Sequence, residues 1–119
     1  AIDTALRHGV VPAVLSIHSF TPSWKAFRRP WQVALLWDSD PRFTQPLLDA
    51  LRGHGGLTVG DNEPYAGQLP GDSVDRHAIA SGRHNTLIEL RNDLIATDTQ
   101  QQAWAARLAP ILQEVLAQL

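Results

Sequence analysis

The feature that most constrains the fold of this chain is a short apolar run that ends in a histidine. Residues 13–17 are almost continuously apolar and include β-branched side chains, which is typical of a buried strand in a parallel sheet. His18 follows at once, and residues 19–22 then add two hydroxyl side chains, an aromatic ring and a proline. In open α/β sheets, ligands bind just beyond the carboxyl ends of strands, where a histidine can bind a metal or transfer a proton. Taken alone, His18 is better explained as a partly buried structural histidine at a strand end.

The rest of the chain alternates between strand-like and helix-like segments. This alternation predicts a single α/β domain over residues 1–119, with a three-layer, mixed but mostly parallel sheet flanked by helices. Glycines and prolines mark the expected boundaries. The expected strands are residues 13–17, 31–37, 57–60 and 86–90, and the expected helices are residues 1–8, from about 45 to 53, from 72 or 73 to about 80, and from 97 or 98 to the end.

Prolines predict a loop and a helix start, and the last helix carries an apolar stripe. Residues 19–30 contain two prolines and are expected to form a long loop, whereas Asp40 before Pro41 is expected to cap a helix. The final helix carries an apolar stripe that includes Leu112 and Leu116. We interpret this stripe as core packing, with a partner-binding face as the alternative.

Composition excludes several classes of protein. The 119 residues are 44% hydrophobic with a formal net charge of −2, which fits one globular domain and gives no electrostatic footprint for nucleic acid. No apolar run approaches the roughly 20 residues needed to cross a bilayer, and no secretory leader is visible. We therefore expect a cytoplasmic protein that binds neither membranes nor nucleic acid. With no cysteine, a transition metal would need histidine and carboxylate ligands.

The start of the chain suggests a longer polypeptide. Residues 1–6 read like the middle of a helix, and position 1 is not methionine. We expect the chain to be the C-terminal part of a longer protein whose upstream half is a partner of this one. A sheet without its early strands would have an unpaired edge that favours association. Association with a second copy of this chain would give a homo-oligomer.

Glu89 stands inside the apolar strand expected over residues 86–90. A carboxylate in such a strand is costly to bury unless another group pairs with it. Burial favours the protonated form of the carboxyl group and suits it to general acid or base catalysis. A structural ion pair between Glu89 and a nearby arginine explains the same residue.

Two of these stretches together resemble the zinc carboxypeptidases, and a wider set resembles one family within that superfamily. The first pair is Ser-Ile-His-Ser-Phe at residues 16–20 and Glu-Leu-Arg at residues 89–91. Nearly the whole chain looks like the C-terminal half of the N-formylglutamate amidohydrolase family. The blocks that carry this likeness are residues 18–22 (HSFTP), 36–38 (LWD), 60–65 (GDNEPY), 76–78 (RHA) and 88–95 (IELRNDLI).

The resemblance implies a hydrolase that acts on a linear amide with zinc as cofactor. It implies a zinc carboxypeptidase-like fold, and an N-acyl (N-formyl) derivative of a small acidic amino acid, such as N-formylglutamate, as substrate. His18 would be a zinc ligand, and Glu89 would take a proton from the attacking water and deliver one to the leaving amine. On the same grounds, the candidates for substrate binding are Arg76, Asn62, Tyr65 and His77.

The sequence departs from the family pattern in ways that keep a rival function open. A catalytic zinc site usually has three protein ligands, yet no pair of a histidine and an acidic residue with clear spacing precedes His18, and His8 in the expected first helix is a poor substitute. Residues 71–73 are Gly-Asp-Ser, where the family usually has Gly-Tyr-Thr. We therefore expect the remaining ligands to lie outside this chain, which would be inactive alone. The alternative is a non-catalytic α/β ligand-binding domain that keeps the hydrolase scaffold.

Overall fold

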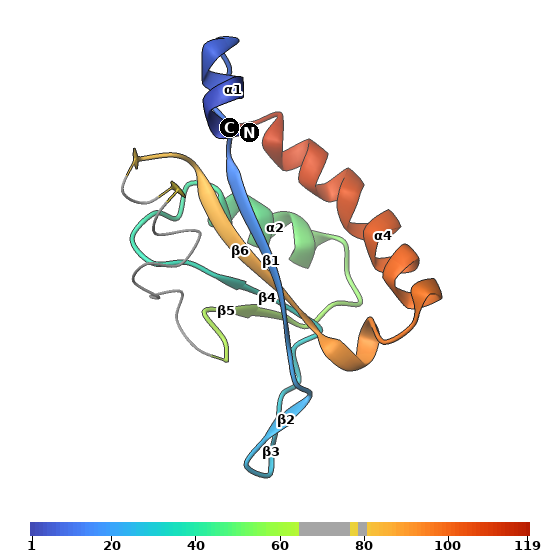
Figure 1. The fold of residues 1–119 in the computed structure, drawn as a ribbon. Helices are drawn as coiled ribbons and strands as arrows, with labels where there is room; N and C mark the ends of the chain where they lie inside the picture. Colours follow the sequence, from blue (N-terminus) through green and yellow to red (C-terminus); the bar gives the residue numbers. More distant parts are fainter. Residues whose placement is uncertain (65–76, 79–80) are drawn as a thin grey trace.

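A four-stranded sheet forms the centre of the computed structural model, which describes residues 1–64, 77–78 and 81–119 (Figure 1). Strand β1 runs parallel to β6, β4 runs parallel to β5, and β4 runs antiparallel to β6. Since two of these three pairings are parallel, the predicted mixed and mostly parallel sheet is confirmed. Across the sheet the strands lie in the order β1 (Val14–Phe20), β6 (Asn85–Arg91), β4 (Val33–Leu36) and β5 (Val59–Asp61).

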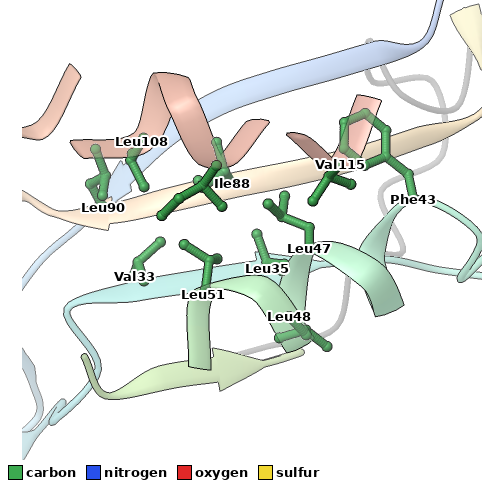
Figure 2. Packing of buried hydrophobic residues seen from close by; sticks show 11 residues of the cluster. Val33, Leu35, Phe43, Leu47, Leu48, Leu51, Ile88, Leu90, Leu108 and Val115 are labelled. Carbon is green, nitrogen blue, oxygen red and sulfur yellow. The ribbon is translucent and has the colours of Figure 1, made fainter. Parts of the chain in front are cut away.

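Helices α2 (Thr44–Gly53) and α4 (Asp98–Leu116) cover one face of this sheet. Figure 2 shows their leucine and valine side chains meeting those of β4 and β6 in one cluster. The alternation of side chains along a strand explains the pattern, because every second residue of β6 and β4 points to this face. The fully buried members of the cluster include Val33, Leu35, Phe43, Leu47, Leu51, Ile88 and Ile111.

The start of α2 differs from the sequence prediction. The residue that precedes the helix is Phe43, which offers no side-chain cap. The Asp40 carboxylate instead accepts hydrogen bonds from the backbone and guanidinium of Arg42, with an Nη2–Oδ2 distance of 2.7 Å. The prediction of Asp40 as the cap was therefore wrong. Pro46 is tolerated because it lies in the first helical turn, where backbone N–H groups have no partner within the helix.

The last helix begins as predicted. Thr97 accepts a hydrogen bond from the Gln100 N–H, and the Gln100 side chain accepts one from the Thr97 N–H, so the two residues form a capping box. Of the predicted apolar stripe, Leu108, Ile111 and Val115 are buried in the core, whereas Leu116 is 45% exposed. Most of the stripe is therefore core packing.

Residues 19–30 are not the long loop that the two prolines suggested. Strand β1 continues to Phe20, and the chain then forms a small antiparallel hairpin of β2 (Ser23–Trp24) and β3 (Phe27–Arg28). Lys25 and Ala26 form its two-residue turn, both with positive φ, as a type I′ turn requires. The sequence concealed this hairpin because such turns ordinarily contain glycine or asparagine. In Figure 1 it extends beyond the end of β1.

The remaining elements complete the described part of the chain. Helix α1 (Ile2–Arg7) precedes β1 and has no buried residue, and a short 3-10 helix, η2 (Asn92–Leu94), follows β6. The helix predicted from residue 72 or 73 to about residue 80 falls mostly outside the described residues. No helix in the described ranges is long and apolar enough to cross a membrane.

Candidate active site on the second face of the sheet

The two residues that the sequence singled out most strongly are direct neighbours in the sheet. His18 on β1 pairs with Glu89 on β6 in the parallel register of these strands. Residues paired in this way point to the same face, and for His18 and Glu89 this is the face opposite α2 and α4, because Ile17 and Ile88 line the helix-covered side. The structure therefore brings the predicted metal ligand and the predicted general base together.

The two side chains differ sharply in exposure. Glu89 is 3% exposed and its Oε2 atom is buried, and it stands on β6, an inner strand with β1 on one side and β4 on the other. His18 is exposed, because β1 is the last strand of the described sheet on that side. The pair therefore combines a carboxylate that is screened from bulk water with an imidazole that is accessible from outside.

The paired residues that include His18 and Glu89 form one row across the strands, and two very small residues continue this row on β4 and β5. Glu89 pairs with Ala34 on β4, and Ala34 pairs with Gly60 on β5. A Cβ atom at Gly60 would lie 3.1 Å from Glu63 Cβ and 3.1 Å from atoms of the Trp31 ring, a tighter contact than packed carbon atoms ordinarily make. The lack of a side chain at Gly60 thus allows the Trp31 ring to lie against the sheet in this row.

Asn62 lies just beyond β5 and joins the ends of two strands. Its backbone has a φ of 51°, a left-handed conformation that asparagine tolerates better than most residues. Its N–H donates to the Leu35 carbonyl at 2.9 Å, and its Oδ1 accepts from the Trp37 N–H at 2.8 Å. The amide oxygen is therefore used within the fold, and a contact with substrate would fall to the Nδ2 group.

Arg91 fastens the segment before β4 to the end of β6. Its Nη1 donates to the backbone carbonyls of residues 29, 30 and 31, each at 3.4 Å. Its Nε donates to Asp93 Oδ1 at 2.7 Å, and this hydrogen bond lowers the pKa of Asp93. Sequence reasoning assigned Arg91 no role of its own, since a carbonyl-binding guanidinium leaves no signal in the residue pattern.

Comparison with known proteins fits this arrangement. Residues 1–96 match the N-formylglutamate amidohydrolase family. The chain belongs to this family. A crystal structure of a gene product from Agrobacterium tumefaciens superposes with a TM-score of 0.87 at 34% sequence identity, covering 98% of this chain. No curated protein matches the sequence.

The chain spans about half the length of that solved structure, since the superposition covers 46% of the Agrobacterium chain. The family name describes enzymes that hydrolyse an amide bond.

Of the other candidate residues of this N-formylglutamate amidohydrolase family member, the structure places His77 elsewhere. His77 is exposed and lines a separate hollow with Arg83 and residues 1–3. The Arg83 guanidinium donates to the His77 carbonyl at 3.0 Å. Neither His18 nor Glu89 lines the hollow that contains His77. Arg76 and Tyr65 fall outside the described residues.

The donor chemistry around His18 suits a zinc ion only in part. An imidazole is a ligand that zinc prefers, and a carboxylate on the adjacent strand is suitably placed to act beside it. Within residues 1–64, 77–78 and 81–119, however, no three histidine, aspartate or glutamate side chains come together as a metal site would require. A complete site would need further ligands from outside these ranges.

Proposed function

We propose that this chain carries half of the active site of a zinc-dependent amidohydrolase. Its substrate would be the N-acyl, in particular N-formyl, derivative of a small acidic amino acid such as glutamate. The observation that carries the proposal is the pairing of exposed His18 with buried Glu89 on one face of β1 and β6. Family membership over residues 1–96 supplies the reaction class.

His18 would be one of the ligands that hold zinc. When bound, zinc supplies a Lewis acid and makes hydroxide available near neutral pH by lowering the pKa of water to about 7. The described residues would position the reacting groups: His18 would hold the ion, and the register of β1 and β6 places Glu89 beside His18. Because adjacent strands are about 4.8 Å apart, the two side chains share one small region of the sheet face.

Glu89 would act as the general base and then as the general acid. A carboxylate within reach of the attacking water takes one proton, and the same group returns a proton to the nitrogen of the leaving amine. Burial at 3% exposure keeps bulk water from this carboxylate, so its proton exchange is confined to groups bound on the same face. The C–N bond breaks as the nitrogen takes the proton from Glu89, and the proton of the new carboxylic acid then passes to the amine, so the products leave as a carboxylate (formate in the N-formyl case) and an ammonium group.

The rest of the site would come from polypeptide that corresponds to the unmatched part of the Agrobacterium structure. Strand β1 ends the described sheet on the side of His18, and Ile17, which is 67% exposed, lines an apolar groove of about 350 Å³ between β1, β6 and α4. Such an edge and groove favour an added strand with apolar side chains. Whether that polypeptide is joined to this chain or separate can be decided by an intact mass measurement of the protein from its native source.

Hydrolysis of N-formylglutamate by the longest native polypeptide that contains these residues tests the proposal. We expect release of formate and of glutamate in equal amounts, and loss of both products after zinc is removed by a chelator. Turnover that is unchanged by the chelator would contradict a zinc enzyme.

A non-catalytic ligand-binding domain is the second candidate, favoured by the incomplete ligand set of the described residues. The two functions differ in their response to Glu89→Gln. The enzyme would lose turnover while still binding N-formylglutamate, whereas a binding domain would show no turnover before or after the change.

A further inference from the structure

We propose that Arg29 binds a carboxylate of the N-acyl amino acid in a hollow at the end of β1, next to the His18 side of the sheet. The hollow measures about 440 Å³. The inference rests on the proposed function for the identity of the ligand, and it assigns substrate binding to a residue that neither the sequence nor the family match singled out. The residues that line the hollow are Ser19, Phe20, Thr21, Trp24 and Arg29.

The charge of Arg29 has no acidic partner among the described residues. Arg42 and Arg91 each form an ion pair with an aspartate two residues away in sequence, at 2.7 Å in both cases. The described residues place no carboxylate within ion-pair distance of the half-buried Arg29. Its Nη1 instead donates to the neutral carbonyl and hydroxyl oxygens of Thr21, both at 3.2 Å. A partly desolvated guanidinium with neutral partners favours an added carboxylate, which it can bind with two parallel hydrogen bonds.

Arg29 is held in place before any ligand binds. Its N–H donates to the Pro22 carbonyl at 2.8 Å, which closes the base of the β2–β3 hairpin. Its own carbonyl accepts from Arg91 Nη1, and its guanidinium carbon lies 5.9 Å from the centre of the Phe20 ring. A side chain fixed in this way loses little conformational freedom when it binds, which favours affinity.

The hollow lies at a suitable distance from His18. Phe20 points to the same face of β1 as His18 and is two residues further along, which is roughly 7 Å on a strand. The carboxylates of an N-acyl amino acid lie several bonds from the acyl carbon, a span on the order of this separation. Trp24, which is 59% exposed, provides an apolar wall for the methylene groups in between.

Calorimetric titration with glutarate tests the assignment without any catalysis. Glutarate carries the carboxylates of the ligand but no scissile amide, and metal-free full-length protein excludes its binding to zinc. We expect Arg29→Gln to weaken glutarate binding about 10- to 100-fold, the usual effect of losing hydrogen bonds to a charged group. Arg28→Gln is the matched control, because it removes the same charge from the neighbouring exposed residue. It should change the affinity less than twofold.

Two results would overturn the assignment: unchanged glutarate binding in Arg29→Gln, or an equal loss in Arg28→Gln. If the glutamine variant fails to fold, Arg29→Lys replaces it, with an expected loss of about tenfold because lysine keeps the charge without the paired hydrogen bonds. In turnover assays, a loss for N-formylglutamate alone assigns the side-chain carboxylate, and an equal loss for N-formylglutamine assigns the α-carboxylate. Failure of the proposed function would appear separately, as the absence of zinc and of hydrolysis in protein that still binds glutarate through Arg29.

Discussion

His18 and Glu89 lie opposite each other on the parallel strands β1 and β6, with their side chains on the same face of the sheet. Their environments differ, since Glu89 is 3% exposed whereas His18 is exposed. An exposed imidazole can reach an ion from outside the sheet, while a buried carboxylate is better suited to a confined proton transfer. This difference in burial is the reason that we propose His18 as a metal ligand and Glu89 as the general base.

Glu89→Gln tests the role of the general base. The change removes the proton acceptor but keeps the shape of the side chain, so we expect kcat for N-formylglutamate to fall by about 10²- to 10⁴-fold. Binding of N-formylglutamate, measured by calorimetry, should change much less. Glu114→Gln, on the exposed side of α4, is the control and should retain full activity. A Glu89→Gln enzyme with at least half of the original kcat would rule out Glu89 as the base.

Gly60→Ala tests the close packing in the row of His18 and Glu89. The new methyl group would lie 3.1 Å from Glu63 Cβ and from the Trp31 ring, so we expect a loss of about 1–3 kcal/mol in the free energy of unfolding. Urea unfolding followed by tryptophan fluorescence measures it. Gly53→Ala is the control, because its new methyl group meets nothing within 4 Å. In the last turn of α2 it should leave stability unchanged or raise it by up to about 1 kcal/mol.

The strands were largely foreseeable from the sequence, but their directions were not. Continuous apolar runs indicate buried strands, and β1, β4 and β6 appear close to where such runs lie. The antiparallel pairing of β4 with β6 depends on contacts between distant segments, which no local pattern encodes. It makes β5 run opposite to β1, so Asn62 follows β5 in the direction away from the carboxyl end of β1.

Only those site residues that belong to a recognisable sequence pattern could be predicted. His18 and Glu89 were candidates because each polar group interrupts or ends an apolar run. Arg29 left no such signal, because its significance comes from what surrounds it in space: neutral partners on Thr21 and a fixed backbone. The family match over residues 1–96 motivates the proposed reaction class, which no single spacing in the chain could establish.

Acid should selectively remove the contribution of Asp40 to stability. The hydrogen bond from Arg42 lowers the pKa of Asp40 below its ordinary value. A carboxyl group with a lowered pKa stabilises the fold at neutral pH, and this contribution is lost as the pH falls through the lowered pKa of the folded state. Asp40→Asn should therefore be less stable than the original protein at pH 7, with a difference that shrinks below about pH 4.

Urea unfolding of both proteins at a series of pH values measures this difference. Asp49→Asn is the matched control, since Asp49 is exposed and forms no ion pair with the described part of the chain. Its stability relative to the original protein should vary less with pH. An Asp40→Asn difference that stays constant from pH 7 to pH 2 would contradict the account of this ion pair.

Thr97→Ala should weaken the start of α4. The Thr97 hydroxyl accepts from the Gln100 N–H at 3.2 Å, and loss of such a cap costs about 1 kcal/mol of unfolding free energy. Thermal and urea unfolding detect a change of this size, and Gln102→Ala on the exposed surface of the same helix is the control. Loosening the start of α4 should lower global stability, because this helix contributes Leu108, Ile111 and Val115 to the core. Equal stability of Thr97→Ala and Gln102→Ala would mean that the cap does not stabilise the helix.

Zinc content of the longest native polypeptide that carries this chain tests the central claim most directly. Metal analysis after dialysis should find about one zinc ion per polypeptide in the original protein and in the control His54→Gln, whose histidine is exposed at the end of α2. His18→Gln should lose most of the zinc, while its unfolding free energy measured without metal changes by less than about 0.5 kcal/mol, because the side chain is exposed. Absence of stoichiometric zinc in the protein with His18 intact, or full retention in His18→Gln, would contradict the account.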